Sequence, residues 1–129
     1  MIVMRKDLNM RKGKMVAQGA HASVNAILNG KEVVTDVGRG TTEIRLNITE
    51  GTPLREWIDG RYTKICVSVN SEEELDKVKA ACDEAGIPNA LVIDAGLTEF
   101  HGIPTKTCLG IGPWYTEEID KITGTLSLL

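Results

Sequence analysis

Residues 64–74 read Lys-Ile-Cys-Val-Ser-Val-Asn-Ser-Glu-Glu-Glu, which is an apolar run followed at once by a helix-capping sequence. The run at residues 64–69 predicts a buried strand. Ser71 with Glu74 three residues later is a capping box, in which each side chain satisfies a free amide at the start of a helix. A second apolar run at residues 90–93 predicts another strand after that helix. A strand, a helix and a strand in this order predict an α/β fold.

The flanking sequence continues this alternation on both sides. We expect further strands at residues 2–5 and 107–112, and further helices at residues 12–28, 52–57 and 116–123. Because strands and helices alternate, we predict a three-layer α/β sandwich, with a mixed sheet of about four strands and helices on both faces. Residues 1–129 are expected to form a single domain, with an inserted loop or hairpin at about 31–51.

Composition places this chain among ordinary globular domains. Its 129 residues are 42% hydrophobic and 26% charged. No apolar run approaches the ~20 residues that span a bilayer, so we expect a cytoplasmic protein with no membrane partner. The three cysteines form no Cys-x-x-Cys pair, and each is expected to be a small buried hydrophobe.

The charge of the chain is unevenly distributed. Its net charge is −3, yet residues 1–14 hold five cations and one anion. A basic N-terminal region on an otherwise acidic protein suits a ligand whose phosphates bind at one place only. A solvated basic loop remains the alternative explanation.

The expected helix at residues 12–28 carries a polar row. Lys14, Gln18 and His21 stand at i, i+4 and i+7, which puts a cation, an amide and an imidazole on one helical face. We expect this row to face a cleft for an anionic ligand, while the opposite side, apolar and small, packs against the sheet. That opposite side consists of Met15, Val16, Gly19, Ala20, Ser23, Val24, Ile27 and Leu28.

Two nucleotide-binding motifs are excluded by their spacing. The Gly-Lys pair at residues 13–14 would need a glycine at position 8 and a Ser or Thr at position 15 to form a P-loop, and Leu8 and Met15 stand there. The Gly-Ile-Gly at residues 110–112 lacks the third glycine of a dinucleotide fingerprint. No arrangement of His, Cys, Asp or Glu matches a metal motif, so we do not expect a metal enzyme.

Asp94 follows the apolar run at residues 90–93 and precedes Ala95 and Gly96. Open α/β sheets bind ligands at the carboxyl ends of their strands. An Asp in this position also caps loops, which is its commoner use. Position alone favours the capping role and leaves a role in a ligand site open.

Three segments of the chain together resemble one enzyme family. The first comprises residues 5–10 (Arg-Lys-Asp-Leu-Asn-Met), 12–14 (Lys-Gly-Lys) and 17–22 (Ala-Gln-Gly-Ala-His-Ala). The second is Asp94-Ala95-Gly96 with Thr98. The third is residues 107–113 (Thr-Cys-Leu-Gly-Ile-Gly-Pro), followed by 119–124 (Ile-Asp-Lys-Ile-Thr-Gly). In order and spacing, this set resembles the archaeal and eukaryotic type of peptidyl-tRNA hydrolase over nearly the whole chain, apart from about residues 31–51.

The resemblance implies hydrolysis of the ester that joins a peptide to the terminal ribose of tRNA, without metal or cofactor. It also implies a mixed four-stranded sheet, a homodimer, and the acceptor end of peptidyl-tRNA as the partner. The active-site positions of the family transfer to Lys14, Gln18, His21, Asp94, Thr98 and Thr107.

Ester hydrolysis needs an activated water, a stabilised oxyanion and an oriented substrate. We expect Asp94 to pair with Lys14 and to orient the water, because an Asp beside a lysine has a lowered pKa and is a poor base. Lys14, or the helix amides near Gly13, would stabilise the developing negative charge. Thr98 and Thr107 would position water or ribose hydroxyls.

The remaining candidate residues concern the substrate. Arg5, Arg11 and Lys12 are expected to hold phosphates near the acceptor end, and Gln18 is expected to bind the substrate. His21 has two interpretations, a proton relay or an imidazole packed against the sheet.

Two positions depart from the family pattern. Leu97 stands where an arginine is usual, and Glu99 where a glutamine is common. Both changes remove positive or neutral polar character from the edge of the site, so tRNA affinity is expected to be weaker or rearranged. Two alternatives follow: an RNA- or protein-binding module of the same fold with weakened activity, or a small-molecule hydrolase or ligand-binding protein using the same cleft.

Overall fold

The computed structural model describes all residues of the chain, 1–129. At its centre is a four-stranded sheet in the order β4-β1-β6-β5. β1 pairs in parallel with β4 and antiparallel with β6, which pairs antiparallel with β5. The predicted mixed sheet is therefore confirmed. Its strands are β1 (Ile2–Arg5), β4 (Cys66–Val69), β5 (Asn89–Asp94) and β6 (Thr105–Ile111).

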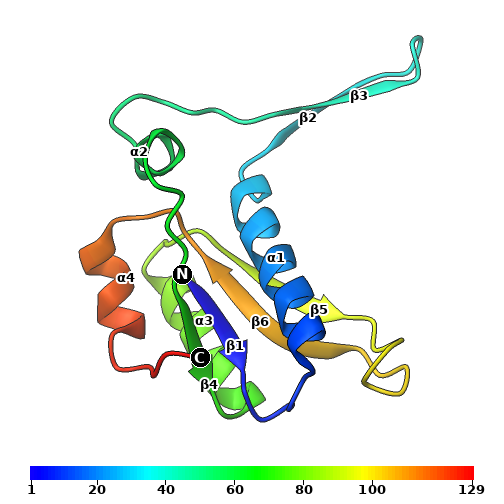
Figure 1. Cartoon of the computed structure of the whole chain (residues 1–129). Coiled ribbons are helices and arrows are strands. Elements are labelled where there is room, and N and C mark those ends of the chain that lie inside the picture. Colours follow the sequence, from blue (N-terminus) through cyan, green and yellow to red (C-terminus); the bar gives the residue numbers. More distant parts are fainter.

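Helices cover both faces of this sheet (Figure 1). α1 (Lys12–Leu28) lies alone on one face, against β1, β5 and β6. α3 (Glu72–Glu84) and α4 (Thr116–Thr123) contact each other on the opposite face. The three-layer α/β sandwich predicted from the sequence is confirmed. None of the helices is both long and apolar enough to cross a bilayer.

Side-chain alternation along β1 divides the core into two clusters. Ile2 and Met4 point toward α1 and pack in one cluster with Ala22. Val3 points to the other face and packs in the second cluster, with Leu75 of α3. Burying a side chain of this kind contributes about 1.5–3 kcal/mol. The two clusters therefore hold the helices on the sheet.

The starts of two helices follow the signals in the sequence. At α3, Ser71 Oγ accepts a hydrogen bond from the Glu74 amide at 3.1 Å, and the Glu74 carboxylate accepts one from the Asn70 amide at 2.7 Å. At α2 (Pro53–Asp59), Thr52 is the N-cap, and its side chain accepts the amide of the third helical residue. Free amides at both helix starts are thus satisfied.

The inserted segment is a hairpin that projects from the body. β2 (Glu32–Asp36) and β3 (Thr41–Arg45) pair antiparallel, with Val33 opposite Ile44. They form a two-stranded sheet of their own, and Figure 1 shows it extending well beyond the end of α1. Almost all residues of the two strands are exposed, so the hairpin adds little to the core.

α1 has the predicted bounds but a different rotation about its axis. Gln18 and Ala22 are its buried residues, whereas Val16 and Val24, from the side expected to pack on the sheet, are exposed. The expected orientation is therefore right only in part: Met15 and Gly19 do pack toward Ile2 and Met4, but the side that carries Val16 and Val24 does not face the sheet. The helix crosses β6 at Gly110, where any Cβ would clash with the Ala22 carbonyl, so this glycine fixes which side of α1 approaches the sheet.

Candidate active site

A β-bulge turns Thr107 toward α1. In the pairing of β5 with β6, Val92 stands opposite Cys108 and Ile93 stands opposite Lys106, which leaves Thr107 as the extra residue. An extra residue breaks the alternation of side chains along a strand. Thr107 and Cys108 consequently both face α1, to which both hydrogen-bond.

Asp94, the last residue of β5, has both roles that its position suggests. Its Oδ1 accepts a hydrogen bond from the Gly96 amide at 2.8 Å, which caps the following loop. Its Oδ2 accepts hydrogen bonds from Lys14 Nζ at 2.6 Å and from Gln18 Nε2 at 2.9 Å. Asp94 therefore caps the loop with Oδ1 and joins a polar cluster with Oδ2.

A chain of hydrogen bonds joins five side chains, which we call the α1-face cluster: Lys14, Gln18, Asp94, Thr98 and Thr107. Thr107 Oγ1 donates to Gln18 Oε1 at 2.5 Å, and the Gln18 amide nitrogen donates to Asp94. Lys14 donates to Asp94 and also to Thr98 Oγ1, at 3.0 Å. The network fixes the Asp94 carboxylate from two directions.

The α1-face cluster combines low exposure with a balanced charge pair. The side chains of Lys14 and Asp94 are 11% and 14% exposed, and the ring of Phe100 lies 5.5 Å from Lys14 Nζ. The hydrogen bond from Lys14 lowers the pKa of Asp94 below its ordinary value, against the opposing effect of desolvation. Asp94 is therefore ionised at neutral pH, a good acceptor and a weak base.

Two members of the cluster lie behind its accessible edge. Gln18 is 2% exposed and Thr107 is fully buried. Their polar atoms bond to each other, and Gln18 also bonds to Asp94. This burial does not fit the expectation that Gln18 binds substrate or that Thr107 itself positions water or ribose. In this geometry they orient the carboxylate.

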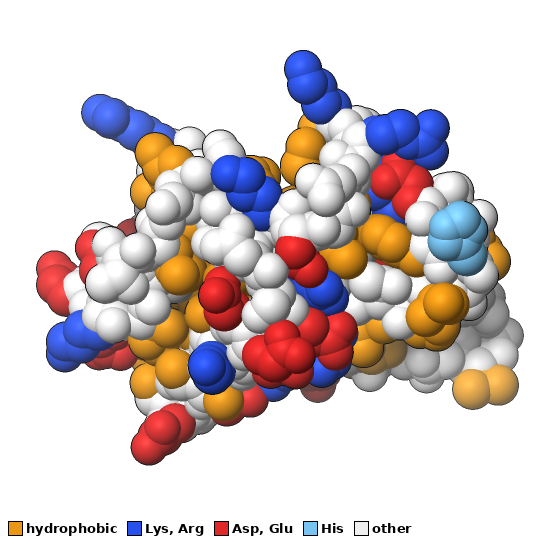
Figure 2. Space-filling model, turned by 90° about the horizontal axis from the view of Figure 1, so that it is seen from below, with side chains coloured by type: hydrophobic (Ala, Val, Ile, Leu, Met, Phe, Trp, Pro, Cys, Tyr) orange, Lys and Arg blue, Asp and Glu red, His pale blue; other side chains and the backbone are white.

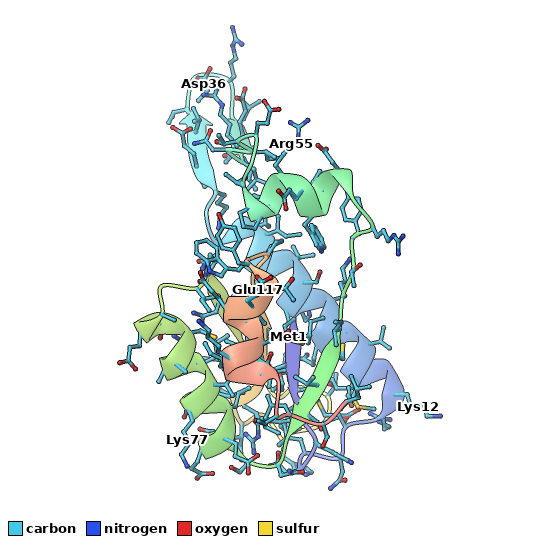
Figure 3. All side chains as sticks on the ribbon, turned by 90° about the vertical axis from the view of Figure 1, so that its left-hand side faces the viewer. Met1, Lys12, Asp36, Arg55, Lys77 and Glu117 are labelled. Carbon is cyan, nitrogen blue, oxygen red and sulfur yellow. The ribbon has the colours of Figure 1, made fainter.

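Arg11, Lys12 and Gly13 lie at the start of α1, beside the cluster. Arg11 Nε donates to the Glu99 carboxylate at 2.7 Å. Lys12 is exposed, and Figure 3 shows its side chain extending away from the ribbon. Figure 2 views this end of the molecule and shows lysines and arginines scattered among hydrophobic, polar and acidic side chains. Of these two cations, Lys12 is open to a phosphate and Arg11 is already paired.

Arg5 lies on the opposite face of the sheet from Asp94. Its guanidinium is paired with Asp7 at 2.6 Å and with Glu72 at 2.9 Å, and it also donates to the Lys106 carbonyl. The side chain is 10% exposed. The expectation that Arg5 holds a tRNA phosphate is therefore wrong, because four of its five N–H donors are taken and the sheet separates it from the α1-face cluster.

His21 is exposed on α1, and no hydrogen bond joins it to the α1-face cluster. The rotation of α1 that buries Gln18 and Ala22 turns this imidazole toward solvent. Its packing against the sheet is thus ruled out, and its role as a proton relay stays a prediction. No group of three or more His, Cys, Asp or Glu side chains is arranged to hold a metal ion.

One known protein family matches the whole of this chain. The family model described as peptidyl-tRNA hydrolase PTH2 matches residues 1–129, the entire chain. The chain belongs to the PTH2 family. The resemblance seen in the three sequence segments is confirmed.

Individual relatives of this PTH2 chain agree with the family match. A protein of Methanothermobacter thermautotrophicus named peptidyl-tRNA hydrolase is 44% identical over 128 residues, covering 99% of this chain and 96% of the relative. Another of that name, from Methanopyrus kandleri, is 41% identical, covering 99% and 95%. A solved structure of a protein of unknown function from Agrobacterium tumefaciens C58 superposes with a TM-score of 0.55 at 14% identity, covering 99% and 94%. That last likeness supports the fold alone.

Sequence reasoning did not find two parts of this PTH2 site. The bulge at Thr107 leaves no signal in the hydrophobic pattern of β6, because an apolar run does not show where alternation breaks. The pairing of Arg11 with Glu99 had a signal, since Glu99 departs from the family pattern. From the sequence alone, that departure indicates an effect on tRNA affinity and gives no sign of a contact with α1.

Proposed function

We propose that the α1-face cluster hydrolyses the ester bond between the peptide and the terminal ribose of tRNA. Membership of the PTH2 family makes the chain a peptidyl-tRNA hydrolase. The observation that supports placing the reaction at this cluster is the Lys14–Asp94 pair, 2.6 Å apart and held on both sides by hydrogen bonds. Preorganised groups of this kind stabilise charge that develops in a transition state.

Asp94 orients the attacking water in this proposal. A carboxylate offers about four lone-pair positions, and Gly96, Gln18 and Lys14 take three of them. One position remains for a hydrogen bond from water. Because the lowered pKa makes Asp94 a weak base, its contribution is orientation of the water more than removal of its proton.

Lys14 stabilises the negative charge that develops on the ester carbonyl oxygen. An ammonium group has three donors, and Asp94 and Thr98 accept two of them. The third donor is available to the oxyanion. Thr98 accepts from Lys14 and keeps its own hydroxyl proton, which it can donate to water or to a ribose hydroxyl.

Substrate binding in this proposal uses few phosphate contacts. Lys12, and the helix amides near Gly13, lie beside the α1-face cluster and bind phosphates at the acceptor end. His21, further along α1, is accessible as a proton relay. A small number of contacts agrees with a net charge of −3 for the whole chain.

The organisation of the protein forms a second part of the proposal. Residues 1–129 act as one domain, with the hairpin as an insertion, and the protein works in the cytoplasm as a homodimer. The exposed Val16 and Val24 on α1 support an apolar surface for self-association. Light scattering coupled to size-exclusion chromatography tests the homodimer, and a monomer mass would contradict it.

The proposed reaction is tested by incubating the protein with peptidyl-tRNA in EDTA and following release of free tRNA. We expect cleavage by the unaltered protein and a loss of about 100-fold or more in kcat for Asp94→Asn. Asp83→Asn is the matched control, because Asp83 also lies 2.6 Å from a lysine, Lys79, on the exposed side of α3. Binding of peptidyl-tRNA without cleavage would contradict the proposal and select the binding-module alternative.

A further inference from the structure

We propose that Glu99 is a positioning residue for the ester hydrolysis. It ties the loop between β5 and β6 to the first turn of α1, and this fixes Thr98 against Lys14. The inference rests on the proposed function of the α1-face cluster and extends it to a residue at which this chain departs from the family pattern.

α1 begins without a cap of its own. Arg11 is the N-cap residue, its side chain makes no capping hydrogen bond, and the first turn contains no acidic residue. Glu99, in the loop between β5 and β6, supplies both the capping hydrogen bond and the negative charge that the first turn of α1 lacks. Its carboxylate accepts the Arg11 amide at 3.3 Å and Arg11 Nε at 2.7 Å. A negative group at this point satisfies a free amide and balances the positive end of the helix dipole.

The residues on either side of Glu99 both contact Lys14. Thr98 Oγ1 accepts its ammonium at 3.0 Å, and the Phe100 ring lies 5.5 Å from the same nitrogen. Three consecutive side chains of the loop therefore meet one turn of α1. Since Glu99 is the middle one, its bond to Arg11 sets the distance between the loop and the catalytic lysine.

Backbone contacts within the loop hold it together, so a displacement of Glu99 also displaces the residues next to it. Gly96 has a φ of +80° and packs against the backbone of Ile103, where a Cβ would not fit. The Gly102 amide donates to the Gly96 carbonyl, and the Ile103 amide donates to the Phe100 carbonyl, both at 2.9 Å. A braced turn of this kind moves as a unit, and Thr98 moves with it.

The burial of the Arg11–Glu99 pair is asymmetric. The Glu99 side chain is 14% exposed, whereas Arg11 is 78% exposed. The carboxylate is therefore held inward, against the start of the helix, and the guanidinium lies outside it. We infer that the bond from Glu99 to the helix start matters more than the charge of Arg11. The Arg11 amide and Arg11 Nε donate to different oxygens of Glu99. A glutamine at this position keeps one oxygen, which can still accept the Arg11 amide at the helix start.

Four variants assayed on peptidyl-tRNA test the role of Glu99. For Glu99→Ala we expect kcat to fall about tenfold with KM within about twofold, because a small displacement of a catalytic group costs rate more than binding. Glu99→Gln is expected to restore kcat to within about twofold. Arg11→Ala is expected to lower kcat less than Glu99→Ala, because the Arg11 amide still donates to Glu99. Glu43→Ala, which removes an exposed partner of Arg45 on the hairpin, is the unaffected control.

A Glu99→Ala enzyme with unaltered kcat would overturn the inference, and so would a Glu99→Gln enzyme as slow as Glu99→Ala. A rise in KM alone would also overturn it, because it would place Glu99 in substrate binding. If Glu99→Ala does not fold, Glu99→Asp replaces it; the shorter side chain is expected to be slow, and equal rates for Asp and Gln contradict the role. Inactivity of the unaltered protein is the separate outcome that contradicts the proposed function.

Discussion

The two faces of the central sheet carry polar clusters of opposite character. The α1-face cluster holds one cation and one carboxylate among neutral side chains. The other, which we call the α3-face cluster, holds two cations and three carboxylates: Arg5, Asp7, Glu72, Asp76 and Lys106. Two adjacent residues of β6 belong to different clusters: Lys106 pairs with α3, and the bulge turns Thr107 toward α1.

The clusters differ most in how exposed their carboxylates are: Asp7, Glu72 and Asp76 are 30%, 43% and 45% exposed, whereas Asp94 is 14% exposed. On the α3 face, Arg5 and Lys106 each contact two carboxylates, and these ion pairs join α3 to the sheet. On the α1 face, Lys14 and Asp94 each keep a free position at an accessible edge. The number of charges therefore does not single out the cluster proposed to be catalytic; a half-buried charge pair that is oriented by several hydrogen bonds and keeps a free position does.

The largest expected effect is on stability, from removing Arg5. Arg5→Met leaves Asp7 and Glu72 without their partner, and since these carboxylates are partly solvated we expect a loss of about 2 kcal/mol in the free energy of unfolding. The folded Arg5→Met protein should keep its kcat, because Arg5 lies across the sheet from Asp94. Denaturant unfolding and steady-state kinetics on one preparation check this. A fall in kcat with unaltered stability would show that the α3-face cluster takes part in the reaction.

The next effect concerns Thr107, on the α1 face. Thr107→Val removes the hydroxyl that orients Gln18, and we expect kcat to fall about tenfold, equivalent to roughly 1.4 kcal/mol for one lost hydrogen bond. Thr107→Ser keeps the hydroxyl and should retain most of the rate. Equal rates for the Val and Ser variants would mean that the Thr107–Gln18 bond does not position Asp94.

The pH dependence separates the clusters further. Lys14 lowers the pKa of Asp94, and Arg5 lowers that of Asp7. A carboxylate with a lowered folded-state pKa contributes stability above its unfolded pKa, and that stability is lost as pH falls through the folded value. Both faces should therefore lose stability in acid. Only titration of Asp94 should reduce kcat/KM.

We expect Lys14→Met to move the acid limb of the residual kcat/KM to higher pH, because Asp94 then loses the group that lowers its pKa. Arg5→Met should leave that limb in place. The pH profiles of the two variants provide the measurement. A limb that moves in Arg5→Met and not in Lys14→Met would reverse the assignment of roles.

The smallest effect is expected at Lys12. Lys12→Ala should raise KM about threefold and reduce the slope of log affinity against log salt by about one, since one phosphate contact is lost. Lys77→Ala, an exposed lysine on α3, serves as the control for general charge. An unaltered salt slope for Lys12→Ala would remove Lys12 from the phosphate site.

Much of the architecture could be predicted from local signals. The capping box at Ser71, the apolar runs of β4 and β5, and the Thr-Pro start of α2 act within a few residues, so the sequence displays them directly. The three-layer sandwich followed from the alternation of these elements. The residues Lys14, Asp94 and Thr98 were identified through the family resemblance, and the structure places them in contact.

The rotation of α1 could not be predicted, because the rule that apolar residues face the sheet holds for Met15 and Ala22 but not for Val16 and Val24. Gln18 is buried because it hydrogen-bonds to Thr107 and Asp94 on the sheet, and Val16 is exposed as a consequence. The position of Arg5 shows the same limit. A basic residue near the N-terminus, Arg5, is expected from the sequence to belong to a phosphate site. Strand alternation instead points Arg5 toward α3. Which helix covers which face of the sheet cannot be seen in any local sequence pattern.

A double-mutant cycle on kcat tests most directly whether Lys14 and Asp94 act as one catalytic unit. It compares Lys14→Met, Asp94→Asn and the double variant with the unaltered protein in single-turnover cleavage of peptidyl-tRNA. Residues that act as a unit have strongly non-additive effects, so we predict that the double variant is no slower than the slower single variant. A double variant whose loss equals the product of the two single losses would contradict the account.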